Sequence, residues 1–376
     1  MSARRWVTSI TTAIGIGAGA AAAQVGIGYG LGIIAWPEQA GGEGESAWVT
    51  SLAWATWIAA TSAAVGTVCA NRLDTGRAST LETQGTARNR VAAALRRGVL
   101  SLSATIGALV TIPLVALPAR AVNHPSTSVP ETIAGGYALV GVVLGLVIAL
   151  GALAARAIAA NMLASVGWFW LLAVATVVEG VTAGRGGATT QLAVWQFTPP
   201  GPEVSTINVW QALFTLGSAL VIGVLAALPA ARRGDTALGV ALSGAVGPLL
   251  VAAVYLLVAP TLTEVSSREI SAYLVAPYAV IAGLAGSVAV AGFGPRLARP
   301  ARQDPVWMPT PDQARPDAPA ADSSDTPNES RSAAAVAPDG PGTGADPTDP
   351  TDTPSAGDAA RTAEAGGRSG KGRRRR

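Results

Sequence analysis

Residues Ile133 to Val178 read IAGGYALVGVVLGLVIALGALAARAIAANMLASVGWFWLLAVATVV, and Arg156 is the only charged residue among them. A single helix over this stretch would be about 69 Å long, more than twice the hydrocarbon core of a bilayer, which is about 30 Å thick. We therefore predict two membrane-spanning helices joined by a tight hairpin near Arg156 to Asn161. Such a hairpin would place the aromatic run Trp168 to Trp170 toward the inner membrane interface, where these rings are enriched.

Runs of the same kind recur along residues 1–295, and each is long enough to cross a bilayer. Half of the chain is apolar and only 13% is charged, against about 25% in an ordinary soluble domain. The pattern predicts an all-α integral membrane protein, a polytopic bundle of about eight transmembrane helices. The predicted spans cover residues 6–36, 47–70, 98–117, 133–155, 162–183, 209–231, 236–259 and 271–294.

The arginines between these spans predict the orientation, because positive residues gather on the cytoplasmic side of a membrane protein. With the N-terminus inside, the outer loops hold only Arg120, Arg185 and Arg268 before the tail. The inner segments hold Arg4, Arg5, Arg72, Arg77, Arg88, Arg90, Arg96, Arg97, Arg156, Arg232, Arg233, Arg296, Arg299 and Arg302. We expect a plasma-membrane protein with both termini in the cytoplasm. Its richness in Ala, Gly, Val, Pro and Arg indicates a bacterium with a GC-rich genome.

Residues 296–376 are rich in Pro, Ala and Asp and poor in residues that can form a core, which predicts a disordered cytoplasmic tail. The tail ends in a basic cluster, and anionic lipid is a partner that this cluster would attract. The cluster consists of Arg373, Arg374, Arg375 and Arg376. The basic loop from Asn71 to Arg97 is a second segment that would lie on anionic lipid. The alternatives are a tail that is only solvated and a loop that only sets orientation.

The first predicted span contains GIGAGAAAAQVGIGYG, residues 15–30. Its first half fits a loose dinucleotide-binding pattern, but such a pattern requires a strand before it and a βαβ unit around it. On a helix, its glycines form one small-residue stripe, which lets a neighbouring helix approach closely. The predicted packing residues are Gly15, Gly19, Gly26 and Gly30, against another span or a second copy. An alternative is that residues 1–23 are a cleaved signal peptide.

Polar residues inside membrane spans are functional candidates by default. Glu179 lies near the outer end of its span, as an interfacial residue or a contact for a cation or substrate. Gln24 is expected to form a hydrogen bond between helices. In the outer loop from Gly184 to Asn208, QLAVWQF is apolar at Leu192 and Val194. This pattern indicates a segment packed on the membrane surface, and the loop is the external candidate for a partner or ligand contact.

The sequence offers little chemistry for catalysis. Cys69 is the only cysteine and His124 the only histidine, which excludes a disulfide within the chain and the usual Cys and His clusters for metal. His124 lies in a loop without an arrangement that indicates a hydrolase. We expect no enzyme activity, no catalytic residue, no cofactor, no metal and no nucleic-acid partner.

The function favoured by the sequence is a non-enzymatic scaffold, regulator or membrane subunit of a larger assembly, with an unknown membrane or cytoplasmic protein partner. The alternative is a permease for a neutral or apolar small solute without a buried proton relay. Three prolines within spans favour this alternative, because interrupted helices line substrate sites in transporters. They are Pro113, Pro248 and Pro277.

Overall fold

The structure is a computed structural model that describes residues 3–38, 42–78, 87–122, 127, 129–184, 190–196, 203–204, 207–261 and 267–297. The predicted disordered tail lies outside these residues except for its first two positions. The basic cluster at residues 373–376 and the loop residue His124 also lie outside them.

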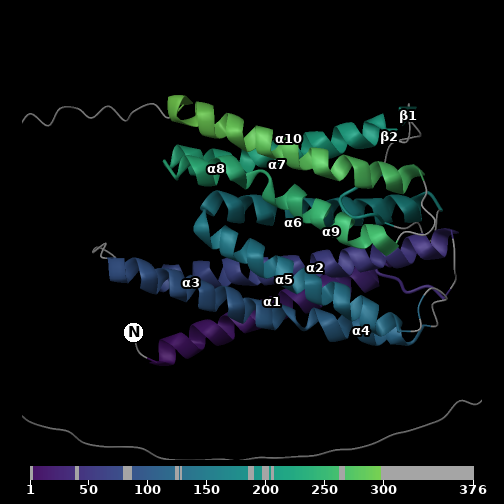
Figure 1. The fold of residues 1–376 in the computed structure, drawn as a ribbon, viewed down its shortest axis with the longest axis horizontal. Coiled ribbons are helices and arrows are strands. Elements are labelled where there is room, and N and C mark those ends of the chain that lie inside the picture. The colour runs from purple at the N-terminus through teal and green to yellow at the C-terminus, as the bar shows by residue number, and fades with distance from the viewer. Residues whose placement is uncertain are drawn as a thin grey trace, which may run out of the picture. The chain divides into compact units, whose positions relative to one another are not determined.

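The described residues form long, roughly parallel helices (Figure 1). The helices are α1 (Ala3–Gly30), α2 (Gly42–Ala78), α3 (Ala87–Ala108), α4 (Thr111–Arg120), α5 (Pro130–Ala154), α6 (Arg156–Thr182), α7 (Val209–Arg232), α8 (Ala237–Ser243), α9 (Val246–Val258) and α10 (Ser267–Leu297). A 3₁₀ turn, η1 (Ala259–Thr261), follows α9. Two short antiparallel strands, β1 (Glu203–Val204) and β2 (Ile207–Asn208), precede α7.

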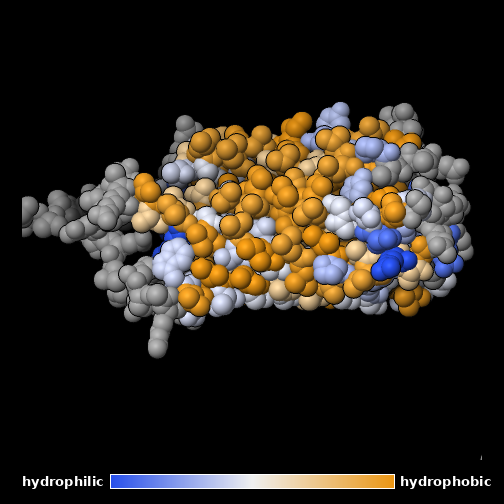
Figure 2. Space-filling view, turned by 60° about the horizontal axis from the view of Figure 1, so that its bottom comes forward, coloured by the Kyte–Doolittle hydropathy of each residue, from blue (hydrophilic) through white to orange (hydrophobic). Residues whose placement is uncertain are grey.

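Seven spans within the described residues are long and apolar enough to cross a membrane, counting α3 and α4 together. Helices α8 and α9 form a further span that is bent by 46° at a short break. Figure 2 shows hydrophobic residues over the middle of one face, with hydrophilic residues mostly toward its ends. The prediction of an all-α polytopic membrane bundle of about eight helices is confirmed.

The connection between α5 and α6 is shorter than predicted. Ala155 alone separates the two helices, and its extended backbone (φ −141°, ψ 128°) reverses the chain. The predicted inner-interface position of Trp168 to Trp170 is wrong, because these residues lie near the middle of α6. The Trp170 side chain is drawn into the bundle by a hydrogen-bond acceptor on α1 and by two tryptophans on α2.

Glycine sets how closely the principal helix pairs approach. A Cβ atom at Gly141 or Gly145 of α5 would overlap backbone carbonyls of α2. Likewise, a Cβ atom at Gly223 of α7 would overlap the carbonyl of Gly283 in α10. Small residues permit such backbone contacts in membranes, where van der Waals packing replaces hydrophobic association between helices.

The chain has two halves, α1–α5 and α6–α10, with a similar arrangement. In each half the second and fourth spans form the largest contact, α2 with α5 and α7 with α10. In each half the third span is also interrupted, at Leu109 and Val110 in the first and at Gly244 and Ala245 in the second. Pro113 and Pro248 follow these interruptions, whereas α10 continues through Pro277.

An aromatic cluster joins the two halves. Trp54 and Trp57 of α2 are fully buried, and their rings lie 5.4 and 6.1 Å from that of Trp170 in α6. The indole N–H of Trp170 donates to Gln24 Oε1 of α1 at 2.9 Å, and Gln24 Nε2 donates to Ser62 Oγ of α2 at 2.9 Å. One amide therefore connects three helices that belong to both halves.

The glycine contacts predict a position-specific effect on stability. Gly141→Leu forces α5 away from the α2 backbone and is expected to lower the free energy of unfolding by about 1 to 3 kcal/mol, as overpacking does. Gly136→Leu on the same helix is the control, because no atom lies within 4 Å of a Cβ built there. Denaturant titration of both variants in mild detergent measures the difference, and equal losses would contradict the packing.

Candidate functional site

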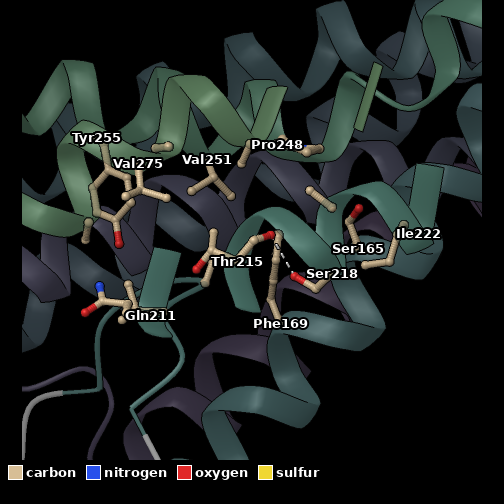
Figure 3. A pocket seen from close by; sticks show the side chains of 16 residues that line it. Ser165, Phe169, Gln211, Thr215, Ser218, Ile222, Pro248, Val251, Tyr255 and Val275 are labelled. Atoms are coloured by element: carbon tan, nitrogen blue, oxygen red, sulfur yellow. Dashed lines mark hydrogen bonds between the residues drawn. The ribbon is translucent and has the colours of Figure 1, made fainter. Parts of the chain in front are cut away.

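A pocket lies in the second half of the bundle (Figure 3). Four helices, α6, α7, α9 and α10, form its walls together with residues 193–194. The lining residues are Ser165, Phe169, Ala193, Val194, Gln211, Thr215, Ser218, Ala219, Ile222, Pro248, Val251, Tyr255, Ala272, Val275, Ala276 and Ala279. None of these described lining residues is ionised at neutral pH, so the pocket is apolar with a few neutral polar groups.

The polar groups of α7 follow one side of the pocket. Gln211, Thr215 and Ser218 are four and three residues apart, which places them on the same helix face. Ser218 Oγ donates to the Thr215 carbonyl at 3.0 Å (Figure 3). The facing helices α9 and α10 contribute mostly aliphatic side chains. A ligand would therefore meet one neutral polar side and one apolar side.

One end of the pocket lies beside the break between α8 and α9. Figure 3 shows Ser165, Ile222 and Pro248 at this end and Gln211 with Tyr255 at the other. At the start of α9, the N–H of Gly247 donates to Asn161 Oδ1 of α6 at 3.1 Å. This contact satisfies one backbone donor that the break would otherwise leave unpaired.

Residue 247 must be glycine for α6 and α9 to approach here, because a Cβ atom would overlap Ser165 Oγ. The Ser165 side chain is almost completely buried, at 2% exposure. Its hydroxyl oxygen has no hydrogen-bond partner among the described residues. The hydroxyl oxygen is packed against Gly247 and has almost no surface open to the pocket.

Residues 190–196 lie against the pocket, which Ala193 and Val194 line. Leu192 and Val194 are buried, and Ala193 has a positive φ of 59°. The prediction that QLAVWQF packs on the membrane surface is therefore wrong, because this segment inserts between helices. The segment is held by side chains from two helices: Tyr255 OH donates to the Leu192 carbonyl at 2.5 Å and Trp54 Nε1 to the Thr190 carbonyl at 2.7 Å.

The predicted packing stripe of α1 faces away from the described part of the chain. No atom of a neighbouring element lies within 4 Å of a Cβ built at any of its four glycines, Gly15, Gly19, Gly26 and Gly30. The face that packs contains Gly17 and Gly28, and Gly17 contacts Gly66 of α2 and Ala104 of α3. The predicted contact of this stripe with another span is therefore not formed among the described residues.

The two predicted polar contacts lie apart from the pocket. Gln24 is buried and forms the hydrogen bonds between α1, α2 and α6 described above. Glu179 is half-buried in the last turn of α6. Neither residue lines the pocket. Within the described residues, no group of three His, Cys, Asp or Glu side chains is placed to hold a metal ion.

Sequence reasoning missed the residues that form the pocket. The spacing of Gln211, Thr215 and Ser218 on an otherwise apolar span was a usable signal, because it marks one polar helix face. Ser165 carried no such signal, since a single serine in a membrane helix commonly bonds its own backbone. Tyr255 and Leu192 are 63 residues apart in the chain, and only the fold brings them together.

No protein-family model matches the chain, and no curated protein or solved structure shows significant similarity to it. The pocket and the surfaces of the bundle are therefore the basis for proposing a function.

The hydrogen bond from Tyr255 to the Leu192 carbonyl predicts how the variant Tyr255→Phe changes the segment 190–196. Loss of the bond to the Leu192 carbonyl is expected to increase amide hydrogen exchange in residues 190–196 by about fivefold, because a hydrogen bond contributes about 1 kcal/mol. Tyr137→Phe is the control, since Tyr137 OH donates to the Leu257 carbonyl at 3.1 Å, outside this segment. Hydrogen exchange with mass spectrometry measures both variants. Equal exchange in this segment for both would contradict the role of Tyr255.

Proposed function

We propose that the protein is a permease for a neutral, largely apolar small solute and that the pocket between α6, α7, α9 and α10 binds it. The observation that carries the proposal is an uncharged pocket beside a broken membrane span. Interrupted helices line the substrate sites of many transporters. The lining is also mostly apolar with a few polar groups, as small-molecule sites usually are.

The lining residues support a neutral solute. An ionised group that enters an apolar site without a counter-charge loses its hydration at a cost of several kcal/mol or more. The described lining residues supply hydroxyl and amide groups and aliphatic carbons. The similar arrangement of the two halves is further support, because many transporters consist of structural repeats.

We also propose a bacterial plasma-membrane location with both termini in the cytoplasm. Support comes from the arginine distribution in the sequence and from Arg156 and Arg232, which are the first residue of α6 and the last residue of α7. Positive residues favour the cytoplasmic side.

Reporter fusions test this orientation. A fluorescent protein fused after Arg302 is expected to fluoresce, because this reporter folds in the cytoplasm. Alkaline phosphatase fused after Asn208 is expected to be active, because this enzyme folds on the outer side of the membrane. An inactive phosphatase after Asn208 together with an active one after Arg302 would reverse the proposed topology.

A second function, a membrane subunit of a larger assembly, is favoured by the outward face of α1. Its glycines leave the helix backbone uncovered by described residues of this chain, and such faces pack against helices in membranes. Under this proposal the protein would co-purify with a partner of fixed stoichiometry in mild detergent. Recovery of the isolated chain alone would contradict it.

The permease proposal predicts the effect of filling the pocket. Thr215→Phe places a ring in the pocket, whereas Leu213→Phe enlarges an exposed side chain on the same helix. Neutral solutes that raise the melting temperature of the wild-type protein in nanodiscs are expected to lose this effect with Thr215→Phe and keep it with Leu213→Phe. The same solutes are expected to cross proteoliposomes faster with wild-type protein than with Thr215→Phe.

Three results would contradict this proposal. They are stabilisation by charged solutes only, stabilisation by neutral solutes that Thr215→Phe leaves unchanged, and binding that never leads to flux across proteoliposomes. Binding without flux, together with a partner that co-purifies, would favour the second function, a membrane subunit of a larger assembly.

A further inference from the structure

We propose that residues 190–196 are a movable plug, and that their withdrawal from between the helices opens the pocket to a solute. This inference rests on the proposed function and names how the same site is regulated. It depends on three observations: the small free space of the pocket, the position of this plug segment beside two spaces, and the contacts that hold and oppose it.

The pocket in this structure is too small for a solute. Its free space is about 30 Å³, whereas sites that hold small molecules enclose roughly 300 Å³ or more. An element that lines the pocket must therefore move before a solute can enter. Four of the five lining elements are membrane helices, and two of them, α7 and α10, are in backbone contact at Gly223 and Gly283. Among the described lining residues, only residues 193–194 lie outside a helix.

The plug segment also borders a second space. Gln191 and Leu192 line a smaller pocket with a free space of about 10 Å³, and Tyr255 and Ala272 line both pockets. Leu192 is only 1% exposed, and Val194 is 4% exposed. Withdrawal of the segment would remove these two side chains from between the helices and would join the two spaces into one larger cavity.

A few contacts hold the plug segment between the helices. Trp54 of α2 and Tyr255 of α9 donate hydrogen bonds to its carbonyls at Thr190 and Leu192. Burial of its apolar side chains adds to this attachment. The hydrogen bonds come from side chains on two different helices, so loss of one donor leaves the helices themselves intact.

Two features of the inserted segment oppose these contacts. Ala193 has a φ of 59°, in a region that residues with a Cβ atom adopt only at a steric cost. Gln191 is 9% exposed and its Oε1 atom has no hydrogen-bond partner among the described residues, so a buried acceptor is left unsatisfied. Backbone strain of this kind occurs in switch regions, where it is part of the mechanism. The inserted state is therefore held by a small number of contacts against two internal costs, as a reversible closure requires.

Thiol labelling tests the inference without a solute. In a Cys69→Ala background, Val194→Cys supplies a single thiol at a buried position of the plug segment. Its reaction with N-ethylmaleimide in nanodiscs is followed by mass spectrometry, and the rate reports how often the segment withdraws. Tyr255→Phe is expected to raise this rate about fivefold, because one hydrogen bond to the segment is lost. Tyr137→Phe is the matched control and is expected to leave the rate unchanged, since Tyr137 OH donates to the Leu257 carbonyl.

Ala193→Gly is expected to change the labelling rate in the opposite direction. Glycine adopts a positive φ without the steric cost, so this variant stabilises the inserted segment and is expected to lower the rate about fivefold. A segment that is only loosely packed would respond the other way, because glycine adds conformational freedom.

The outcomes separate the plug from the permease. Opposite changes for Tyr255→Phe and Ala193→Gly are the expected result, and equal rates or faster labelling in both would overturn the plug. A thiol at position 194 that reacts only after denaturation would also overturn it, because the segment then does not withdraw. Opposite changes without the solute flux expected above would support the plug and contradict the proposed permease.

Discussion

The hydrogen bond from the Gly247 N–H to Asn161 Oδ1 allows a membrane helix to stop and restart inside the bundle. Within a bilayer, backbone polar groups must find partners in the protein, and an interruption is tolerated only where neighbouring helices supply them. Asn161 supplies an acceptor, and the glycine at 247 lets α6 come close enough to reach. The pocket depends on this contact, because α9 is bent by 46° from the axis of α8 and lines the pocket after the bend.

The two halves serve different structural purposes. In the first half, α2 is enclosed by α1, α3 and α5, and its tryptophans pack against α6. This aromatic contact and the Gln24 hydrogen bonds hold α6 on one side. The closely packed pair α7 and α10 forms the other side, and the pocket lies between the two. The first half therefore packs against the side of α6 that faces away from α7 and α10, and the pocket lies in the second half.

Much of the helical architecture was predictable, because the length of a charge-free run reports directly on the thickness of the bilayer. The turn between α5 and α6 lies at Ala155, one residue before the predicted segment. The α1 stripe was harder to assign, since Gly15 and Gly17 both belong to small-residue faces and helical spacing cannot say which face is covered. The Leu192 and Val194 pattern indicated burial correctly but not whether lipid or protein would cover these side chains.

The pocket itself depended on information that the sequence does not display. Ser165, Thr215 and Tyr255 come from three helices, and their meeting is decided by glycine contacts and by the break near Gly247. By contrast, the predicted stripe of Gly15, Gly19, Gly26 and Gly30 contacts no other helix among the described residues.

The central claim is that the pocket beside the α8–α9 break holds a neutral ligand. The most direct measurement is an experimental structure of the wild-type protein in lipid nanodiscs, with a neutral solute that raises its melting temperature present at saturation. The account predicts solute density between α6, α7, α9 and α10, beside Thr215. A pocket that contains no solute density under these conditions, or density at another site only, would contradict it.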